Sequence, residues 1–228
     1  MMDSETVRLV ADPYPPYQYA DGPEIRGVDH EVIAAAFQEE GLQATTTLLP
    51  WNECVEAVKT RAADGIFQIQ RTPERDAIFL FSDPLRTART VFFAGETSRF
   101  RFSAEVDPLQ TLAAHRLGIV RGYGYEPRIL ELPDSAKVVV ETQEELLLGL
   151  TTDRFDVAIV DLGVAASLSS KLGLHGLQQV AGFEISRVLH VAFHKGRRKW
   201  VGRFNAGLRR MHERGIATDI LARYAMTE

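Results

Sequence analysis

The sequence predicts an α/β protein made of two lobes. Short apolar runs of the length of buried strands alternate with amphipathic stretches of helical period, which is typical of strands joined by crossover helices. One plan occurs twice: an aspartate, a buried strand and a polar residue at the carboxyl end of the strand lie at 64–70 and again at 156–161. The length of 228 residues suffices for two modest lobes. We expect lobe 1 to comprise residues 1–94 and 191–228, and lobe 2 to comprise residues 95–190.

In the first half of the chain, each strand pattern is followed by a loop or a helix start. A rigid loop rich in proline and tyrosine, residues 12–19, follows the first strand. Gly41 ends the first helix, and Pro50 and Trp51 open the second. The expected strands are 6–11, 44–49, 65–70 and 90–94, and the expected helices are 29–40, one that starts at 51 and one that starts at Pro73.

The second half repeats this alternation after a polar, irregular stretch at 95–108. Thr142 and Glu145 form a capping-box pattern, and Gly215 separates the last two helices. The strand at 188–193 is expected to return the chain to lobe 1, so that two crossings form a hinge. The expected strands are 117–120, 138–140, 157–160, 177–180 and 188–193, and the expected helices are 109–114, 125–132, 143–150, 162–172, 198–214 and 217–224.

Composition indicates an ordinary globular protein and excludes several classes. Hydrophobic residues make up 45% of the chain and charged residues 25%. The net charge of −5, without a basic run interleaved with aromatic residues, argues against a nucleic-acid partner. No apolar run is long enough to span a bilayer, and the first residues lack the apolar region of a signal peptide. The single cysteine, Cys54, excludes a disulfide framework.

The stretch from Ala63 to Leu85 carries the most informative chemistry. Thr72 can cap a helix whose first residue is Pro73, which places Arg75 in the first turn, just past the carboxyl end of a strand. Open α/β sheets bind ligands at that edge, and a guanidinium there suits a carboxylate or a phosphate. The alternative is that Arg75 is a surface residue in a solvated ion pair.

This stretch resembles the signature of the type II periplasmic solute-binding proteins of the amino-acid family, bacterial extracellular solute-binding protein family 3. The shared features are an aspartate before an apolar strand, then Thr-Pro-Glu-Arg, then Phe-Ser-Asp-Pro, and the resemblance extends from Val7 to Tyr224. It implies the periplasmic binding protein-like II fold, in which two Rossmann-like lobes are joined by a two-strand hinge and a ligand cleft lies between the lobes.

The resemblance also implies a function. A member of this family is not an enzyme and has no cofactor; it binds a small solute, such as an amino acid or a related zwitterion or carboxylate, and delivers it to the membrane permease of an ABC transporter. The expected location is the periplasm, with a signal peptide removed from the segment before Asp3, and the expected state is a monomer.

Several positions can be assigned from the family's pattern. There, Arg75 would receive the ligand's α-carboxylate, with the glycine-led turn at Gly122 assisting, and Asp161 would receive the α-ammonium. Tyr14 and Trp51 would form the apolar walls, although Trp51 is equally well explained as a core residue and Asp161 as the N-cap of the helix 162–172. The predicted ligand-binding residues are Tyr14, Trp51, Gln68, Gln70, Arg75, Gly122, Tyr123 and Asp161.

Three residues depart from the amino-acid binders. Position 70 is Gln where Thr or Ser is usual, position 68 is Gln where a small residue is common, and Arg71 adds a second cation. These differences leave room for a dicarboxylate or another anion.

Two further functions stay open. The same fold serves as the extracytoplasmic sensor domain of histidine kinases and cyclic-dinucleotide enzymes. A cyclohexadienyl dehydratase-like lyase would need a further acid, for which Glu184 is the candidate. The sequence otherwise lacks catalytic motifs of the hydrolase, metalloprotease and redox types. His190 and His194 do not have the spacing of a metal site on a strand, and we expect no metal and a packed, unreactive Cys54.

Overall fold

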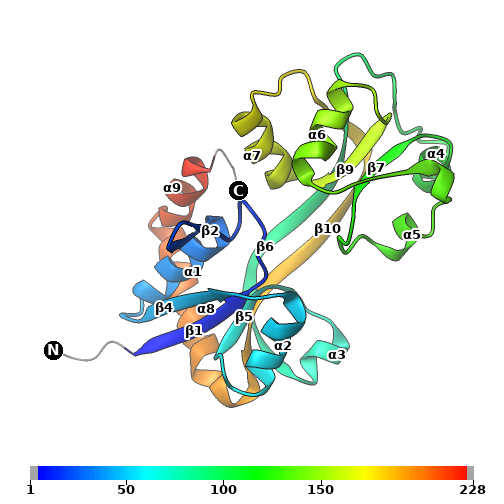
Figure 1. The fold of residues 1–228 in the computed structure, drawn as a ribbon. Helices are drawn as coiled ribbons and strands as arrows, with labels where there is room; N and C mark the ends of the chain where they lie inside the picture. The colour runs from blue at the N-terminus through cyan, green and yellow to red at the C-terminus, as the bar shows by residue number, and fades with distance from the viewer. Residues whose placement is uncertain (1–4, 225–228) are drawn as a thin grey trace. The chain divides into compact units, whose positions relative to one another are not determined.

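The computed structural model describes residues 5–224 and divides into two compact units. Unit 1 comprises Met1–Thr87 and Arg187–Glu228, and unit 2 comprises Ala88–Ser186. Strand β6 (Phe79–Ala94) carries the chain from unit 1 into unit 2, and β10 (Gln178–His194) carries it back (Figure 1). The expected signal-peptide cleavage before Asp3 falls on residues outside the described part of the chain.

The changes of unit occur within β6 and β10 rather than at their ends. They lie after Thr87 and after Ser186, whereas the sequence suggested residues 94 and 190. Both strands are much longer than expected. Strand β6 continues through Pro84 and β10 continues through Gly182, although proline and glycine normally end or interrupt a strand. The sequence-based lobe boundaries were placed at strand ends, whereas the two units meet inside the continuous strands β6 and β10.

The sheet of unit 1 has the strand order β4-β1-β5-β10. Strand β1 (Thr6–Ala11) is parallel to both β4 (Gln43–Leu48) and β5 (Gly65–Gln70), and β10 is antiparallel to β5. The carboxyl ends of β1, β4 and β5 therefore share one edge. Loops that follow these three strands are the ones that can build a site there.

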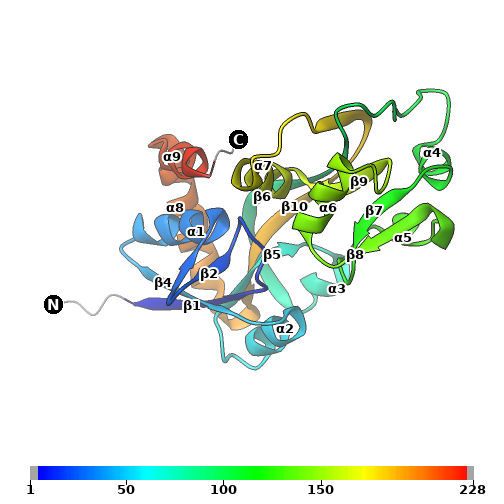
Figure 2. The same cartoon turned by 45° about the horizontal axis from the view of Figure 1, so that its top comes forward.

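Helices cover both faces of this sheet. Figure 2 shows α1 (Val28–Gln38) and α8 (Arg198–Glu213) on one side and α2 (Trp51–Lys59) on the other. On the first side Phe37, Phe193 and Phe204 pack together, with ring centroids 5.3–6.4 Å apart. On the second side Cys54, Val58, Ile66 and Ile69 form the core. The remaining elements of unit 1 are β2 (Tyr19–Asp21), β3 (Glu24–Arg26), α3 (Pro73–Asp76), α9 (Ile216–Arg223) and a 3₁₀ turn at Lys195–Arg197.

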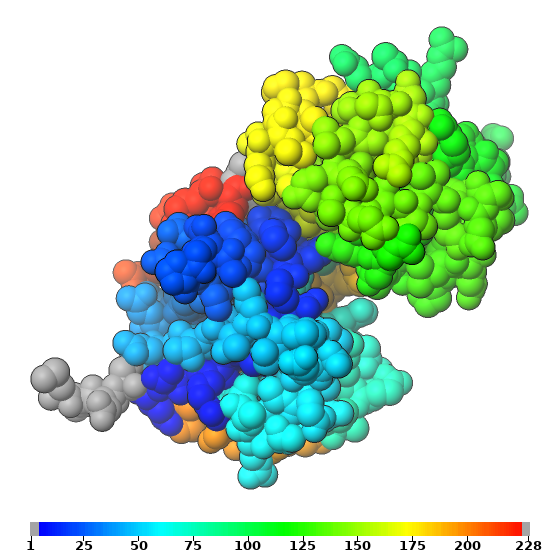
Figure 3. Space-filling model, viewed as in Figure 1, coloured from blue at the N-terminus to red at the C-terminus, as the bar shows by residue number. Residues whose placement is uncertain are grey.

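The sheet of unit 2 has the order β6-β9-β7-β8. Strand β7 (Leu117–Val120) is parallel to β8 (Lys137–Val140) and β9 (Val157–Asp161), whereas β6 is antiparallel to β9. In Figure 3, α6 (Gln143–Thr151) and α7 (Leu162–Leu172) cover the face of unit 2 that is turned toward the reader. Phe92, Leu112, Leu117, Ile129 and Ile159 are among the buried core residues. The other helices are α4 (Pro108–Ala113), α5 (Pro127–Leu130) and a 3₁₀ turn at Asp134–Ala136.

The two aspartates of the repeated plan occupy equivalent places in the two units. Asp64 precedes β5, donates from its backbone N–H to the Arg8 carbonyl (2.8 Å), and accepts from the Arg8 backbone N–H (3.0 Å). Asp156 precedes β9 and forms the same pair of contacts with Arg116, at 2.9 and 2.8 Å. Each carboxylate thereby satisfies a backbone donor, in β1 for Asp64 and directly before β7 for Asp156, and pairs with that residue's guanidinium.

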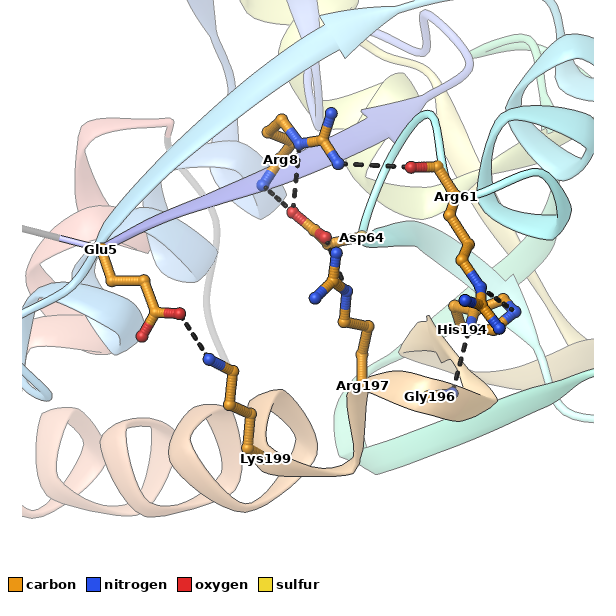
Figure 4. Close-up of polar contacts among 8 residues, drawn as sticks. All are labelled: Glu5, Arg8, Arg61, Asp64, His194, Gly196, Arg197 and Lys199. Carbon is orange, nitrogen blue, oxygen red and sulfur yellow. Dashed lines mark hydrogen bonds and ion pairs between the residues drawn. The ribbon is translucent and has the colours of Figure 1, made fainter.

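Figure 4 shows the arrangement in unit 1. The side chain of Asp64 is 4% exposed and binds the guanidinium groups of Arg8 (3.3 Å) and Arg197 (3.0 Å). Arg8 also donates to the Arg61 carbonyl, and Lys199 pairs with Glu5 nearby. A buried carboxylate with two cationic partners ties β1, β5 and the start of α8 together.

Most of the predicted elements are confirmed, several to the residue. These include the strands 6–11, 65–70 and 117–120 and the helix 162–172. Other expectations were wrong: the strands 177–180 and 188–193 are parts of one strand, and the helix 125–132 shrinks to α5. The hairpin β2–β3 was not foreseen. Within residues 5–224, no helix has the length and apolar character needed to cross a membrane.

Candidate functional site

Five predicted residues follow the carboxyl ends of the unit 1 strands. Tyr14 lies in the loop after β1, Trp51 opens α2 after β4, and Gln68, Gln70 and Arg75 lie at the end of β5 or in α3 behind it. The two parallel pairings of β1 bring these loops to one edge of the sheet. This is the edge at which α/β sheets bind ligands.

Arg75 is held at this edge by local contacts. The Thr72 hydroxyl accepts from the Arg75 backbone N–H (3.4 Å), which confirms the predicted cap, although α3 has a single turn. The guanidinium donates to the Gln70 carbonyl (2.7 Å), and its Cζ lies 5.3 Å from the centroid of the Trp51 ring. Trp51 is half-buried against the core, so it is a core residue that also makes a cation–π contact with Arg75.

The electrostatic state of Arg75 differs from that of its neighbour Arg71. Arg71 pairs with Asp76 at 2.8 Å, whereas Arg75 forms no salt bridge among residues 5–224 and is attracted by the Glu74 carboxylate only at longer range. Partial burial lowers the pKa of Arg75 from its ordinary value, because the charge has lost part of its hydration. A carboxylate ligand would restore that lost stabilisation, and the second cation noted in the sequence is already neutralised.

Gln68 lies at a bulge in β5. Its φ is +59°, and the pairing of β10 passes from Ile69 to Phe67, so that Gln68 has no partner in the ladder. Bulges and left-handed residues other than glycine cost free energy, and they collect at functional sites where they redirect a side chain. The amide of Gln68 accepts from Gln18 Nε2, which also donates to the Asp12 carbonyl (2.8 Å).

Tyr14 belongs to the same loop network. Its ring stacks on Tyr17 with centroids 5.8 Å apart and planes 12° apart. Tyr17 is buried and lies under the guanidinium of Arg86, 3.5 Å from Cζ to centroid, and Arg86 pairs with buried Asp29 at 2.8 Å. Tyr17 is therefore a packing residue, and it fixes the position of Tyr14.

Sequence reasoning missed Asp12 and Gln18. Asp12 is half-buried directly after β1, and burial raises its pKa above the ordinary value. Gln18 is fully buried and connects the β1 loop to the bulge in β5. The position of Asp12 at the end of a strand was available from the sequence, but the contact of Gln18 spans 50 positions and was not.

The other three predicted residues lie in unit 2, again at carboxyl ends of parallel strands. Gly122 follows β7 with φ +75°, which favours glycine, and Tyr123 comes next with its ring 6.4 Å from that of Tyr125. Asp161 ends β9, is 5% exposed, and caps α7 by accepting from Gly163 N (3.0 Å) and Val164 N (3.2 Å). Its N-cap role is confirmed.

The structure thus brings Trp51, Gln70 and Arg75 into direct contact. Gln68 is joined to the same edge of unit 1 through Gln18, and Tyr14 is positioned through Tyr17. Gly122, Tyr123 and Asp161 form the corresponding edge of unit 2.

Three residues weighed for other chemistry have structural roles. His190 is buried and its Nδ1 donates to the Ser82 carbonyl (2.9 Å), and His194 caps the turn before α8 by accepting from Gly196 N (2.9 Å). Glu184 pairs with Arg89 (2.6 Å), which lowers the pKa of Glu184 and opposes a role as proton donor. Among the described residues, no group of three or more His, Cys, Asp and Glu side chains is placed to hold a metal ion.

A family model described as bacterial extracellular solute-binding proteins, family 3, matches residues 7–227. The chain belongs to this family. The arginine-binding extracellular protein ArtP of Bacillus subtilis is 25% identical over 207 residues, which cover 89% of this chain and 78% of ArtP.

Solved structures show the same fold. A histidine kinase sensor domain with similarity to periplasmic binding proteins is 21% identical, with a TM-score of 0.74 and coverage of 97% of this chain and 96% of that one. An ancestral arginine-binding protein bound to arginine is 19% identical, with a TM-score of 0.70 and coverage of 96% and 97%. The predicted two-lobed α/β class is thereby confirmed.

In this family 3 protein the Phe-Ser-Asp-Pro stretch joins β6 to β10 and α8. The Ser82 hydroxyl accepts from Val191 N (3.0 Å), and Asp83 N donates to the Asn205 side chain (2.9 Å). These contacts hold β10 beside β6 within unit 1. The stretch therefore has a structural role here.

Proposed function

We propose that this solute-binding protein is a non-catalytic receptor for a free amino acid, which it binds outside the cytoplasm and delivers to an ABC-type permease. The observation that carries the proposal is the Arg75 guanidinium, which is braced by Trp51 and the Gln70 carbonyl and forms no salt bridge with a carboxylate of the described residues. The ligand's α-carboxylate supplies that salt bridge.

The α-ammonium pairs with the Asp161 carboxylate, the position to which the family's pattern assigns it. The Asp161 carboxylate also caps α7 through Gly163 N and Val164 N.

A cationic side chain suits the ligand best. Asp12 adds a carboxylate at the edge that holds Arg75, and ArtP is named for arginine. Arginine is therefore the first ligand to test. Transport and sensing proteins share this fold, and ligand binding is the step common to both uses.

The test is a thermal-shift titration with arginine, lysine, histidine, glutamine and glutamate. A ligand that binds only the folded protein raises the melting temperature by mass action. Agmatine, which is arginine without its carboxylate, is expected to give no shift. 5-Guanidinopentanoic acid, which lacks the α-amine, is expected to bind less tightly than arginine.

Two variants test which protein residue binds each charged group of the ligand. Arg75→Ala is expected to weaken amino-acid binding by a factor of roughly 10 to 100, because a charge-assisted hydrogen bond contributes about 1.5–3 kcal/mol. Arg71→Ala is the matched control, since Arg71 is already paired with Asp76. Asp161→Asn keeps the cap and removes the charge, and it should weaken only ligands that carry an amine. Undiminished binding by Arg75→Ala would refute the proposal.

A further inference from the structure

Unit 2 contains a cavity of about 540 Å³ at the edge of its sheet opposite to Gly122 and Asp161. The cavity is lined by residues at the amino ends of β7 and β9 and by the loop that follows β6. Strands of four and five residues separate this edge from the carboxyl ends by roughly 10–13 Å. The cavity is therefore distinct from the proposed amino-acid site.

The charged side chains that line this cavity sum to +1, in a chain whose net charge is −5. Arg99, Arg101 and Arg116 line it, together with Asp153 and Asp156. Asp156 is neutralised by Arg116, whose NH2 lies 2.7 Å from Oδ1. The two arginines of the β6–α4 loop thus outweigh the remaining aspartate.

The guanidinium groups retain donors that protein atoms do not use. A guanidinium has five N–H donors. Arg116 directs three of its nitrogens at Asp156 and the Arg154 carbonyl, and Arg101 donates to the carbonyls of Ser98 and Phe100 and to the Gln178 side chain. These contacts hold both groups in place and leave each with two N–H donors.

Arg99 is the least constrained of the three. It is exposed, and it makes no hydrogen bond or ion pair with any residue from 5 to 224. Its five donors are available to a ligand, while Arg101 and Arg116 are already oriented. Two oriented guanidinium groups beside one mobile in its side chain can together bind an anion at a low cost in conformational entropy.

Aromatic side chains form part of the cavity lining. Phe100 and Phe155 are buried, and the ring of His115 lies edge-on to Phe100 with centroids 4.9 Å apart. The Thr111 carbonyl lies 2.8 Å from His115 Nδ1, and because a carbonyl can only accept, Nδ1 carries the proton. The imidazole is thus fixed by its neighbours at the wall of the cavity.

We propose that this cavity is a second ligand site, which binds a small multivalent oxyanion such as phosphate or a di- or tricarboxylate. Planar guanidinium forks match the oxygens of both groups, and more than one fork is engaged only by an anion with several oxygens. A cavity of this volume admits ions of either size. The site is independent of Arg75 and of the proposed amino-acid ligand.

The test is an NMR titration of the ¹⁵N-labelled protein with inorganic phosphate and, separately, with citrate, at constant ionic strength. The expected result is saturable shifts of the amides at 97–101 and 115–116 with at least one anion. Saturation by phosphate alone identifies phosphate chemistry, and saturation by citrate alone identifies a polycarboxylate. Linear, unsaturated shifts with both anions would overturn the proposal.

Variants separate the site from general charge effects. Arg99→Gln and Arg101→Gln are each expected to weaken binding about tenfold, which corresponds to one charge-assisted hydrogen bond. Arg99→Gln breaks no contact within the described chain, so it tests the charge without disturbing the loop. Arg128→Gln is the matched control: Arg128 is an exposed arginine of unit 2 that pairs with Glu126 outside the cavity.

Equal affinity in wild type, Arg99→Gln and Arg101→Gln would refute the assignment even if an anion binds. Arg75→Ala should leave this titration unchanged, because Arg75 belongs to unit 1. The second site and the proposed amino-acid site can therefore fail separately.

Discussion

Replacing Gly207 by alanine tests how closely α8 packs on α1. A Cβ at position 207 would lie 1.8 Å from the carbonyl oxygen of Ala36, whereas real Cβ contacts stay above 3.0 Å. The two helices would have to separate by more than about 1 Å, and the obstructing atom is backbone, which cannot rotate away. Such overpacking costs on the order of 3 kcal/mol, and it would loosen the contacts among Phe37, Phe193 and Phe204.

Gly202 provides the matched control in the same helix. A Cβ there would meet nothing within 4 Å, so Gly202→Ala should stabilise the protein by about 0.5–1 kcal/mol through helix propensity. The assay is urea denaturation followed by circular dichroism, with free energies extrapolated to water. The reasoning is refuted if Gly207→Ala has the same unfolding midpoint as wild type, or if both substitutions shift it equally.

Two further predictions concern Asp156 and Cys54. Hydrogen bonding from Arg116 holds the pKa of Asp156 below its ordinary value of 3.8, so the pair stabilises the fold above about pH 4, and this contribution is lost as the pH falls through the lowered pKa. Asp156→Asn should therefore lose less stability than wild type between pH 7 and pH 3, and equal losses would contradict this. Burial raises the pKa of the Cys54 thiol to about 11, so alkylation by iodoacetamide at pH 8 should be slow in the folded protein and fast in urea. Rapid alkylation of the folded protein would show that the thiol is accessible.

The bulge at Gln68 shows how far local sequence reasoning reaches. The apolar run of β5 and its end at Gln70 were read from the sequence to the residue. The positive φ of Gln68 and its partner Gln18 were not, because glutamine has no preference for that conformation and the contact spans 50 positions. The glutamine at this position, where a small residue is common in the family, accepts a long-range hydrogen bond.

Whether each arginine near the end of β5 is paired with a carboxylate is also decided by the tertiary structure. The sequence identifies Arg71 and Arg75 as two charges near the end of a strand, and it does not show whether either is paired. The structure distinguishes them, since Asp76 lies 2.8 Å from Arg71 while Trp51 and the Gln70 carbonyl contact Arg75. The difference concerns which direction each side chain takes, and that depends on packing.

By itself, the sequence determined the α/β class, most of the strands and helices, the cap at Thr72 and the family's characteristic residues, because these depend on periodicity and on chemistry within a few positions. Only the tertiary structure decided where β6 and β10 change unit, that Asp64 and Asp156 each satisfy a backbone donor in or directly before a neighbouring strand, and that Arg99 and Arg101 line a cavity with Arg116. Those features join segments far apart in the chain, and the physical reason is that hydrogen bonding and burial act through space, whereas sequence patterns report on neighbours.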